Sequence, residues 1–394
     1  MTVLFLLHRE TLRPSTSSGL HRVAQRKISN MKLKELCSYL DSEVPLSFQE
    51  SYDNSGLQVG KADMEINSAI IALDVTEDVI NEAIKGKCNL IVSHHPLIFG
   101  GIKKISDNTQ VGRIIYNCIK HDIAVYSAHT NLDIFKNSVS HKMAEKLELK
   151  NIKVLSPLEN RLLKLVTYVP VSHLDIIRNA VFEAGAGVIG NYDQCGFVTD
   201  GTGSFRGNES ANPFAGKTGE IHHENENRFE TILFSHLKEK VIKALLASHP
   251  YEEVAYDLYE LENKYYGAGL GCTGEFSEEI GEKELLKLIS SVFEAKGVRF
   301  SKLTGKKVKK VAVCGGSGVS LLQVAIASGA DVFITADIKY HNFFDADNKI
   351  LLVDAGHFET EKFSSEILKD LIMKKFPKFA VRFSETNTNP INYL

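Results

Sequence analysis

Four short apolar runs in this chain end beside side chains that can bind metal ions. The runs span residues 90–92, 123–127, 332–334 and 350–353, and their valine and isoleucine content favours β-strands. They are followed, in order, by His94-His95, by His129 and Asp133, by Asp337, and by His357 and Glu361. In open α/β sheets, ligands bind beyond the carboxyl ends of the strands. We therefore expect these groups to meet at one edge of a sheet, although they are far apart in sequence.

Two stretches of the chain alternate between strand and helix patterns. Residues 31–159 and 265–394 both show this alternation, which predicts a largely parallel sheet covered by helices. The predicted fold class is α/β, with two α/β halves that together form a metal-binding core.

A unit with a different pattern, residues 160–264, separates the two halves. Its sequence predicts a strand, a helix that begins after Ser172 as N-cap and ends at Ala184, and two short strands around Gly201. A further strand, a helix and a final strand follow. This order is close to the ferredoxin-like α+β arrangement, so we expect an inserted domain.

A polar, glycine-bearing stretch at residues 207–227 predicts a long loop within the insert. It contains the adjacent pair His222-His223, which has no predicted strand end beside it. We therefore expect this pair to be solvated and not to bind a metal.

Composition and charge exclude several classes of protein. The chain has 394 residues, of which 43% are hydrophobic and 24% charged, as in a soluble protein of more than one domain. A net charge of −3 and a pI near 6.5 predict no sequence-specific nucleic-acid partner and no membrane partner. The six cysteines include no Cys-x-x-Cys pair, which excludes a zinc ribbon and is typical of reduced thiols in a cytoplasmic protein.

The first thirty residues differ from the rest of the chain. They contain five basic residues against the single acid Glu10, together with many serines and threonines, which fits a mitochondrial transit peptide. The interpretation that we favour is an unstructured leader, with natural translation beginning at Met31, where an amphipathic helix starts.

The spacing of the candidate ligands indicates what kind of site they form. His357 and Glu361 lie four residues apart at the start of a predicted helix, so their side chains share one face. His94 and His95 are adjacent and point in different directions, which suits two ions better than one. Imidazole and carboxylate ligands without a thiolate favour Zn²⁺, Fe²⁺ or Mn²⁺. A single histidine at a strand end is more often structural, but several such groups at strand ends favour a metal site.

A glycine-rich turn follows the predicted strand at residues 311–314. It consists of Gly315, Gly316, Ser317 and Gly318 and precedes a helix, a position where backbone N–H groups can bind a phosphate. The turn lacks the dinucleotide fingerprint and the lysine of a P-loop, so a plain tight turn is an equally good interpretation.

Taken together, the motifs resemble those of the NIF-three-like dinuclear-metal proteins, also known as GTP cyclohydrolase I type 2 homologs. The matching segments are 53–60 (DNSGLQVG), 93–96 (SHHP), 129–133 (HTNLD), 269–271 (GLG), 313–318 (VCGGSG), 335–337 (TAD) and 356–361 (GHFETE). They cover both α/β halves, and the order of the histidine motifs is specific. The insert, with its segment 249–253 (HPYEE), is similar to the PII-like insert of the longer bacterial members. One departure is Tyr52, where the family often has tryptophan.

The resemblance implies a centre of two divalent metal ions in which Glu361 bridges both. The implied ligands are His94, His95, Asp133, His357 and Glu361. It also implies a ring-shaped homohexamer with the sites facing an internal cavity, and a small-molecule substrate for which GTP is the candidate. His129 and Asp337 lie outside the implied set, and we expect them to orient ligands or substrate.

The function that we expect is a metal-dependent hydrolase acting on a nucleotide-like substrate. Two adjacent ions can lower the pKa of a shared water toward neutrality, and attack on the purine imidazole carbon would release formate. His129 or His341 would transfer protons, and the turn 315–318 would hold phosphate. Two alternatives remain open: a phosphoester hydrolase at the same site, and a non-catalytic metal-binding or regulatory protein.

Overall fold

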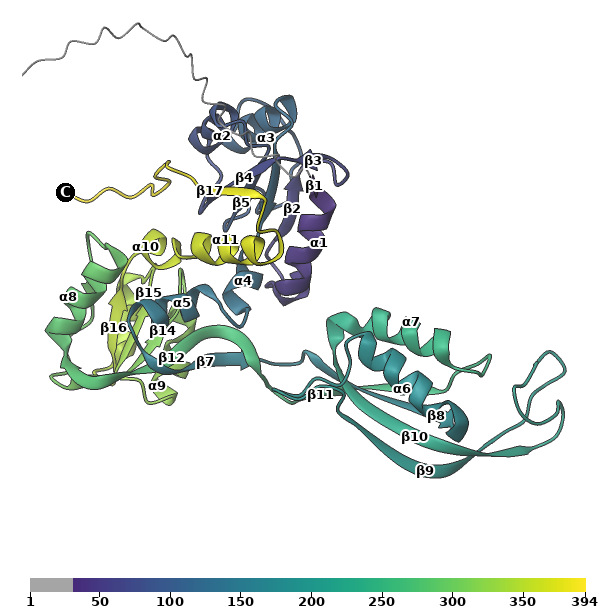
Figure 1. Cartoon of the computed structure of the whole chain (residues 1–394). Helices are drawn as coiled ribbons and strands as arrows, with labels where there is room; N and C mark the ends of the chain where they lie inside the picture. The colour runs from purple at the N-terminus through teal and green to yellow at the C-terminus, as the bar shows by residue number, and fades with distance from the viewer. Residues whose placement is uncertain (1–30) are drawn as a thin grey trace, which may run out of the picture.

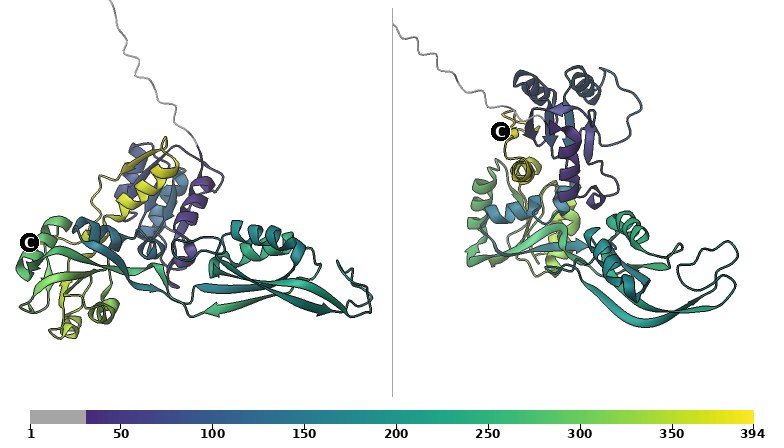
Figure 2. Two further views of the ribbon diagram at one scale, coloured as in Figure 1. Left: turned by 60° about the horizontal axis from the view of Figure 1, so that its bottom comes forward. Right: turned by 45° about the vertical axis from the view of Figure 1, so that its right-hand side comes forward.

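The computed structural model describes residues 31–394, and the predictions for residues 1–30 lie outside that part. The described residues form three large sheets and one small two-stranded sheet. Two α/β units lie against each other, and a third unit extends away from them (Figures 1 and 2). The architecture is a mixed α/β fold with an inserted α+β unit, in agreement with the predicted fold class.

The first α/β unit is built on a five-stranded sheet. Its strand order is β17 (Ala380–Phe383), β4 (Ser68–Ala72), β5 (Leu90–Ser93), β6 (Ala124–Ser127) and β2 (Gly56–Val59). The first four strands are parallel, and β2 pairs antiparallel with β6 at the edge. Since β5 and β6 run side by side in the same direction, the residues that follow them emerge at the same edge of the sheet.

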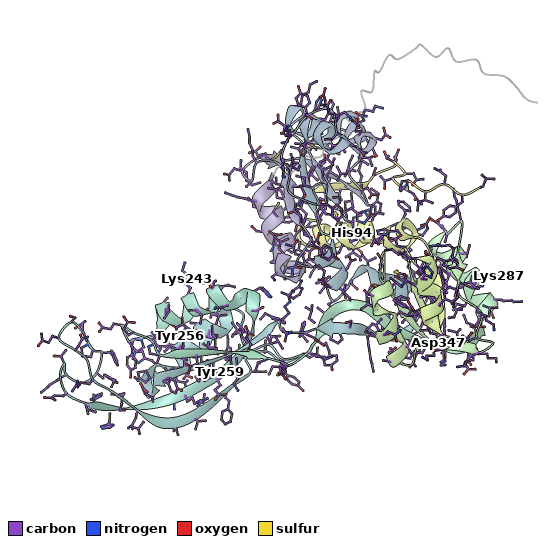
Figure 3. All side chains as sticks on the ribbon, turned by 180° about the vertical axis from the view of Figure 1, so that it is seen from behind. His94, Lys243, Tyr256, Tyr259, Lys287 and Asp347 are labelled. Atoms are coloured by element: carbon purple, nitrogen blue, oxygen red, sulfur yellow. The ribbon has the colours of Figure 1, made fainter. Side chains whose placement is uncertain are left out.

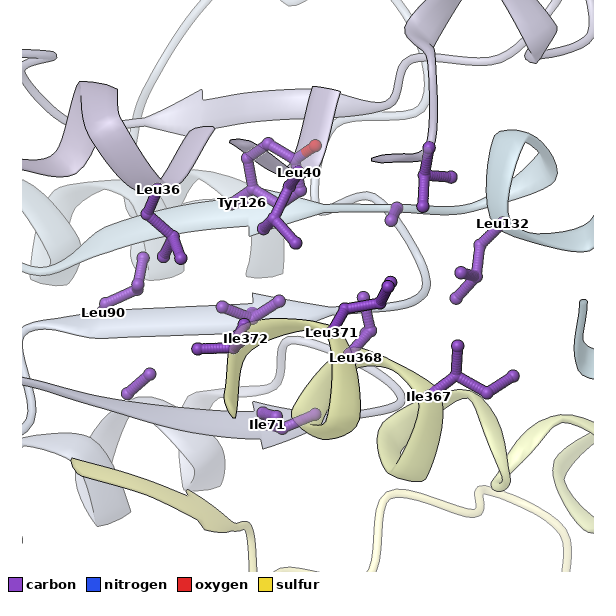
Figure 4. Packing of buried hydrophobic residues seen from close by; sticks show 14 of the residues in the cluster. Leu36, Leu40, Ile71, Leu90, Tyr126, Leu132, Ile367, Leu368, Leu371 and Ile372 are labelled. Atoms are coloured by element: carbon purple, nitrogen blue, oxygen red, sulfur yellow. The ribbon is translucent and has the colours of Figure 1, made fainter. Parts of the chain in front are cut away.

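Helices cover both faces of this sheet. The covering helices are α1 (Leu33–Glu43) and α11 (Ser364–Lys375) on one face, and α2 (Glu77–Lys85) and α3 (Gln110–Lys120) on the other. Leu36 of α1, Tyr126 of β6 and Leu368 of α11 are fully buried in one cluster (Figure 4). Burial of each such side chain contributes about 1.5–3 kcal/mol, so α11 is firmly attached to the first unit.

The second α/β unit is built on a six-stranded sheet. Its strand order is β13 (Arg299–Phe300), β16 (Leu351–Asp354), β15 (Val332–Thr335), β14 (Lys307–Val313), β12 (Tyr265–Gly281) and β7 (Lys150–Leu158). Strands β14, β15 and β16 are parallel, whereas β12 is antiparallel to both β14 and β7. The covering helices are α5 (Val139–Lys146) and α8 (Glu282–Phe293) on one face and α9 (Leu322–Ala327) on the other.

The two α/β units exchange elements across the insert. Helix α5 and strand β7 come from residues before the insert, yet they pack in the second unit. Helix α11 and strand β17 come from the C-terminal end, yet they pack in the first unit. Each unit therefore contains chain from both sides of the insert, which holds the two units together.

The inserted unit has the order β-α-β-β-α-β. Its elements are β8 (Leu162–Pro170), α6 (Leu174–Glu183), β9 (Gly196–Phe205), β10 (His222–Phe234), α7 (Lys238–Ser248) and β11 (Tyr256–Leu261). The sheet is antiparallel in the order β11-β8-β10-β9, and its buried Leu165 and Phe229 pack against Ile177 of α6 and Val241 of α7. This is the ferredoxin-like arrangement.

Two sequence predictions about the strands of the insert are wrong. His222 and His223 begin strand β10 and pair with Phe205 and Ser204, so they do not lie in a loop. The two short strands expected around Gly201 form the single strand β9. The paired residues 199–205 and 222–228 are mostly polar, so this part of the two strands has no alternation of apolar residues from which a strand could be predicted.

The predicted N-cap of α6 is also wrong. Ser172 lies in a 3-10 turn before the helix, and its hydroxyl group bonds to the ring of His173. The side chain of Ser172 therefore does not cap the helix.

Candidate metal centre

The candidate ligands come from three places in the fold. His94 and His95 follow strand β5, Asp133 lies on the short helix α4 (Thr130–Ile134) after β6, and His357 and Glu361 lie on α10 (His357–Glu361) after β16. Figure 3 labels His94 where the two α/β units meet. The structure brings all five residues together, as the strand-end argument predicts.

Three overlapping groups of potential ligand atoms lie within this cluster. The groups are His94–His95–His129, His95–His357–Glu361 and His94–Asp133–Glu361, and in each group the atoms lie within 4.8 Å of one another. Glu361 belongs to two of the three groups, and so do His94 and His95. Glu361 is the one carboxylate that two groups share, which is the arrangement that a bridging ligand requires.

The buried pair His94 and Asp133 leaves polar atoms without partners. His94 is fully buried, and its Nε2 lies 3.7 Å from Asp133 Oδ1 and 3.8 Å from Glu361 Oε2. Within residues 31–394, neither His94 Nε2 nor Asp133 Oδ1 has a hydrogen-bond partner. Two ligand atoms on one tetrahedral Zn²⁺ ion, each about 2.1 Å from it, are roughly 3.4 Å apart. These atoms therefore fit a shared metal ion better than they fit each other.

Glu361 lies between two further histidines. Its Oε2 atom is 2.8 Å from His95 Nε2 and 2.8 Å from His357 Nε2, and those two nitrogens are 3.3 Å apart. Burial alone would raise the pKa of the Glu361 carboxyl, but the bonds from His357 and His95 hold it well below its ordinary value. Glu361 is therefore an ionised, buried ligand that faces imidazoles from both α/β units.

Each of the four clustered histidines is held through Nδ1. The partners are the carbonyl oxygen of Ala128 for His94 (2.8 Å), Asp74 for His95 (2.7 Å), Asp53 for His129 (2.8 Å) and Asp337 for His357 (2.7 Å). A carbonyl or carboxylate partner at one ring nitrogen fixes the ring and directs the other nitrogen toward a metal. The ligand atoms that group together in this cluster are accordingly the Nε2 atoms.

The pKa values of the histidines follow from these surroundings. Burial lowers the pKa of His94 to about 3, so its Nε2 carries a free electron pair at neutral pH. Burial would also lower the pKa of His95, but Asp74 and Glu361 raise it to about 9. Asp337 and Glu361 likewise overcome burial and raise the pKa of His357 to about 10. The neighbouring carboxylates therefore favour the protonated form of both rings.

Two features of the cluster were not predicted from the sequence. The ring of His129 lies in one of the three ligand groups, 5.3 Å from the ring of His94, whereas we expected only an orienting or proton-transfer role. Asp74, which orients His95, was not singled out at all. It lies two residues after β4, at the same edge of the sheet as His94 and His95, but a lone aspartate after a strand is a weak signal in the sequence.

The glycine turn packs against the cluster. A Cβ atom at Gly316, where φ is +58°, would lie 1.9 Å from Glu361 Oε1, so only glycine fits there. The N–H groups of Gly315, Gly316 and Gly318 donate to the hydroxyls of Ser140, Thr360 and Thr335. Because these N–H groups already donate within the protein, they do not support the prediction that the turn binds a phosphate. The turn instead packs against the side chain of Glu361.

A cavity of about 850 Å³ opens above the cluster. Its lining includes His95, His129, Asp133, His357 and Glu361. Apolar residues from both α/β units also line it: Val75, Leu97, Phe99, Val111, Ile114, Leu270 and Leu321. Ser317 also faces this cavity. His341 does not belong to the lining, because its exposed ring lies on a 3-10 turn beside Tyr340 and Phe344.

Comparison with known sequences places this chain among close relatives. The family model for Duf34/NIF3 (NGG1p interacting factor 3) matches residues 31–390. A Bacillus subtilis protein named GTP cyclohydrolase 1 type 2 homolog is 40% identical over 360 residues, which cover 89% of this chain and 95% of the relative. A Halalkalibacterium halodurans protein of the same name is 41% identical over 356 residues, with the same shares of both chains.

Solved structures agree with the sequence comparison. A Bacillus cereus protein related to NIF3 superimposes with a TM-score of 0.79 at 39% identity and covers 94% of this chain and 100% of its own. A Staphylococcus aureus protein superimposes with a TM-score of 0.75 at 31% identity and covers 92% and 99%. The matching family model and these relatives show that the chain belongs to the Duf34/NIF3 family.

Proposed function

We propose that this protein holds two divalent metal ions and uses them to hydrolyse a nucleotide-like substrate. The observation that carries the proposal is the unpartnered pair His94 Nε2 and Asp133 Oδ1, which lies buried next to Glu361. The proposed ligands are His94, His95, Asp133, His357 and Glu361, with His129 as an additional candidate. Zn²⁺, Fe²⁺ and Mn²⁺ are the ions that suit such a set.

The residues of the chain have separate roles in this proposal. Divalent ions held by these ligands would supply Lewis acidity and would lower the pKa of a nearby water. The carboxylate of Glu361 bridges the two halves of the site, and Asp74, Asp53 and Asp337 keep the rings of His95, His129 and His357 in place. His129 is the better placed of the two predicted proton-transfer groups, because it lines the cavity and His341 does not.

The cavity walls indicate how a substrate would lie. The apolar part of the lining, which includes Leu97 and Phe99, suits the flat ring of a purine. Within the described residues, the lining contains no lysine or arginine, so phosphates on a substrate would depend on the metal ions for charge compensation. GTP is the first candidate, because the relatives are named for a GTP cyclohydrolase. Hydrolysis at the imidazole carbon would then release formate.

The test is a substrate screen with metal-loaded protein, in which Glu361→Ala serves as the control. GTP and generic phosphoesters are incubated with both proteins, and formate and phosphate are measured separately. Formate release by the wild type alone supports the cyclohydrolase, and phosphate release by the wild type alone supports the phosphoester hydrolase. If the wild type shows no turnover that Glu361→Ala removes, the hydrolase is rejected and the non-catalytic metal-binding alternative is favoured.

We also propose that the chain assembles with copies of itself, as a homohexamer in the cytoplasm. The loop after β5 exposes Phe99 and Ile105, and α3 exposes Tyr116 and Ile119 nearby, each with more than half of its surface accessible. Such a group of apolar side chains favours association. Light scattering of the purified protein tests the hexamer.

The proposed compartment is a reducing one, because all six cysteines are free thiols. Among residues 31–394, none of the helices has the length and apolar character needed to cross a bilayer.

A further inference from the structure

The last eleven residues of the chain cross the metal centre from one α/β unit to the other. These residues, 384–394, follow β17 and form no helix or strand; we call them the strap. Thr388 and Pro390 of the strap line the cavity above the candidate ligands. The strap therefore passes directly over the place where the two units meet.

The strap begins at an anchor on the first unit. The carboxylate of Glu82 on α2 accepts bonds from the hydroxyl of Ser384 (2.6 Å), the N–H groups of Glu385 (3.1 Å) and Thr386 (3.3 Å), and the hydroxyl of Thr386 (2.9 Å). Burial would raise the pKa of this carboxyl, but the donors from the strap keep it below its ordinary value. Glu82 is thus an ionised anchor with four donors from the strap.

Two consecutive residues of the strap then contact the two ligand sets. The Thr388 hydroxyl donates to Asp74 Oδ2 (2.6 Å), and Asp74 Oδ1 lies 2.7 Å from Nδ1 of His95 on the first unit. The Asn389 amide donates to Oε1 of Glu359 (3.1 Å), a buried residue of α10 between His357 and Glu361. The bond from Thr388 therefore reaches the partner of the ligand His95, and the bond from Asn389 reaches the helix that carries the ligands His357 and Glu361.

The Asn389 contact is tightly constrained at both ends. The Oδ1 atom of Asn389 accepts from the N–H of Ile391 (3.0 Å), which leaves the amide group free to reach Glu359. Glu359 packs so closely below Gly356 that a Cβ atom there would lie 2.2 Å from the carboxylate. Since Gly356 directly precedes His357, the Glu359 carboxylate packs against the start of α10.

The end of the strap reaches the second unit. The ring of Tyr393 covers Gly297, where a Cβ atom would lie 2.6 Å from the ring. The strap is thus attached at Glu82 in the first unit and beside Gly297 in the second, with the metal centre between the two attachments.

We propose that Thr388 and Asn389 are positioning residues that hold the two ligand sets at the separation a pair of metal ions requires. This inference rests on the metal centre proposed above. Thr388 fixes Asp74 and through it the ring of His95, and Asn389 fixes Glu359 and through it the start of α10. Partners behind metal ligands typically change metal affinity by about 10–100-fold when they are lost. Thr388 and Asn389 lie one hydrogen bond further from the ions than such partners. Loss of either side-chain hydrogen bond should therefore weaken metal binding by about tenfold.

The experiment compares the metal affinity of full-length variants by competition with a chelator of known affinity, using Zn²⁺. Thr388→Val removes the hydroxyl at nearly unchanged shape, and Asn389→Asp removes the donor and places a second carboxylate beside Glu359. Thr388→Ser restores the hydroxyl. Thr386→Val is the matched control, because it removes a hydroxyl from the same strap but leaves Glu82 with three other strap donors.

We expect Thr388→Val and Asn389→Asp to bind Zn²⁺ about tenfold more weakly, and Thr388→Ser and Thr386→Val to stay within twofold of the wild type. Cobalt-loaded Thr388→Val should also show an altered visible absorption spectrum, which a general loss of stability would not cause. If the wild type binds divalent ions and both Thr388→Val and Asn389→Asp bind them equally well, the strap proposal alone is overturned. If the wild type binds none, the metal centre and the strap are both overturned.

Discussion

The Nε2 atoms of His95 and His357 lie 3.3 Å apart, although 262 residues and the whole inserted unit separate them in sequence. His95 follows a strand of the first α/β unit, and His357 follows a strand of the second. The exchange of α5, β7, α11 and β17 between the units holds these strands in place. The proposed site is thus a property of the interface between the units.

Removing His94 should remove most of the bound metal. We expect about two divalent ions per chain in the wild type and a loss of affinity of about 10–100-fold or more in His94→Ala, because a buried ligand is lost. His223→Ala is a suitable control, since His223 is exposed on β10 of the insert. Elemental analysis after dialysis measures the metal content. Equal metal content in both variants would contradict the assignment of His94.

Gly316→Ala should damage the site through Glu361. The new Cβ atom would lie 1.9 Å from Glu361 Oε1, so the carboxylate has to move. Gly305→Ala is the matched control, because Gly305 also has a positive φ (+76°) but open space around its Cβ position. Both variants should lose about 1–2 kcal/mol of folding stability from the left-handed backbone. Only Gly316→Ala should lose metal affinity, and equal affinities in chelator competition would exclude this role.

Metal binding should release protons. The pKa values of His95 (about 9) and His357 (about 10) keep both rings protonated at pH 7 in the metal-free protein. Ions that bind at Nε2 must displace these protons, so we expect release of at least two protons per chain at pH 7 and tighter binding as the pH rises. Calorimetry in buffers of different ionisation enthalpy measures this number. A value near zero would mean that the histidines are not ligands.

The folding stability of the metal-free protein should fall as the pH rises, whereas its metal affinity should rise. Both histidines have folded-state pKa values above the unfolded value near 6.5. Their contribution to stability is therefore fully present below about pH 6.5 and is lost as the pH rises through 9 to 10. Urea unfolding of chelator-treated protein between pH 6 and 10 tests this, with His95→Gln as the variant that should show a weaker pH dependence.

Deleting the insert should leave the metal centre intact. Leu158 of β7 pairs with Tyr265 of β12, so a two-residue Asn-Gly turn can replace residues 159–264. The deletion removes Phe234 and His236, whose rings contact Phe48, so some stability is lost. We expect an unchanged number of bound ions, because all the proposed ligands lie outside the deleted segment. Loss of metal from a folded deletion variant would show that the insert contributes to the site.

The sequence predicted the parts of the site that lie at strand ends. His94, Asp133, His357 and Glu361 follow short, strongly apolar strands, and such strands end at one edge of an α/β sheet. The same argument applies to Asp74 after β4, but an isolated aspartate in a loop gives no signal of its own. The grouping of His129 with His94 and His95 could not be predicted, because it depends on how β6 pairs with β5.

The rest of the fold depends on pairings that local sequence does not encode. Strand β10 begins with the polar residues His222–Asn227, which are ordered by pairing with β9 and have no apolar alternation. Helix α11 shows a helical pattern, but nothing in its sequence indicates that it packs on the first unit and not on the second. The strap has no periodicity at all, and its hydrogen bonds to Glu82, Asp74 and Glu359 become visible only in three dimensions.

Anomalous X-ray diffraction from crystals of the metal-loaded protein tests the central claim most directly. Data collected on both sides of the absorption edge of the bound metal should show two peaks about 3.5–4 Å apart. One peak should lie beside His94 and Asp133, the other beside His95 and His357, and the Glu361 carboxylate should lie between them. Loaded crystals without peaks at this cluster, or with a single peak that Glu361 does not touch, would contradict a dinuclear centre shared by the two α/β units.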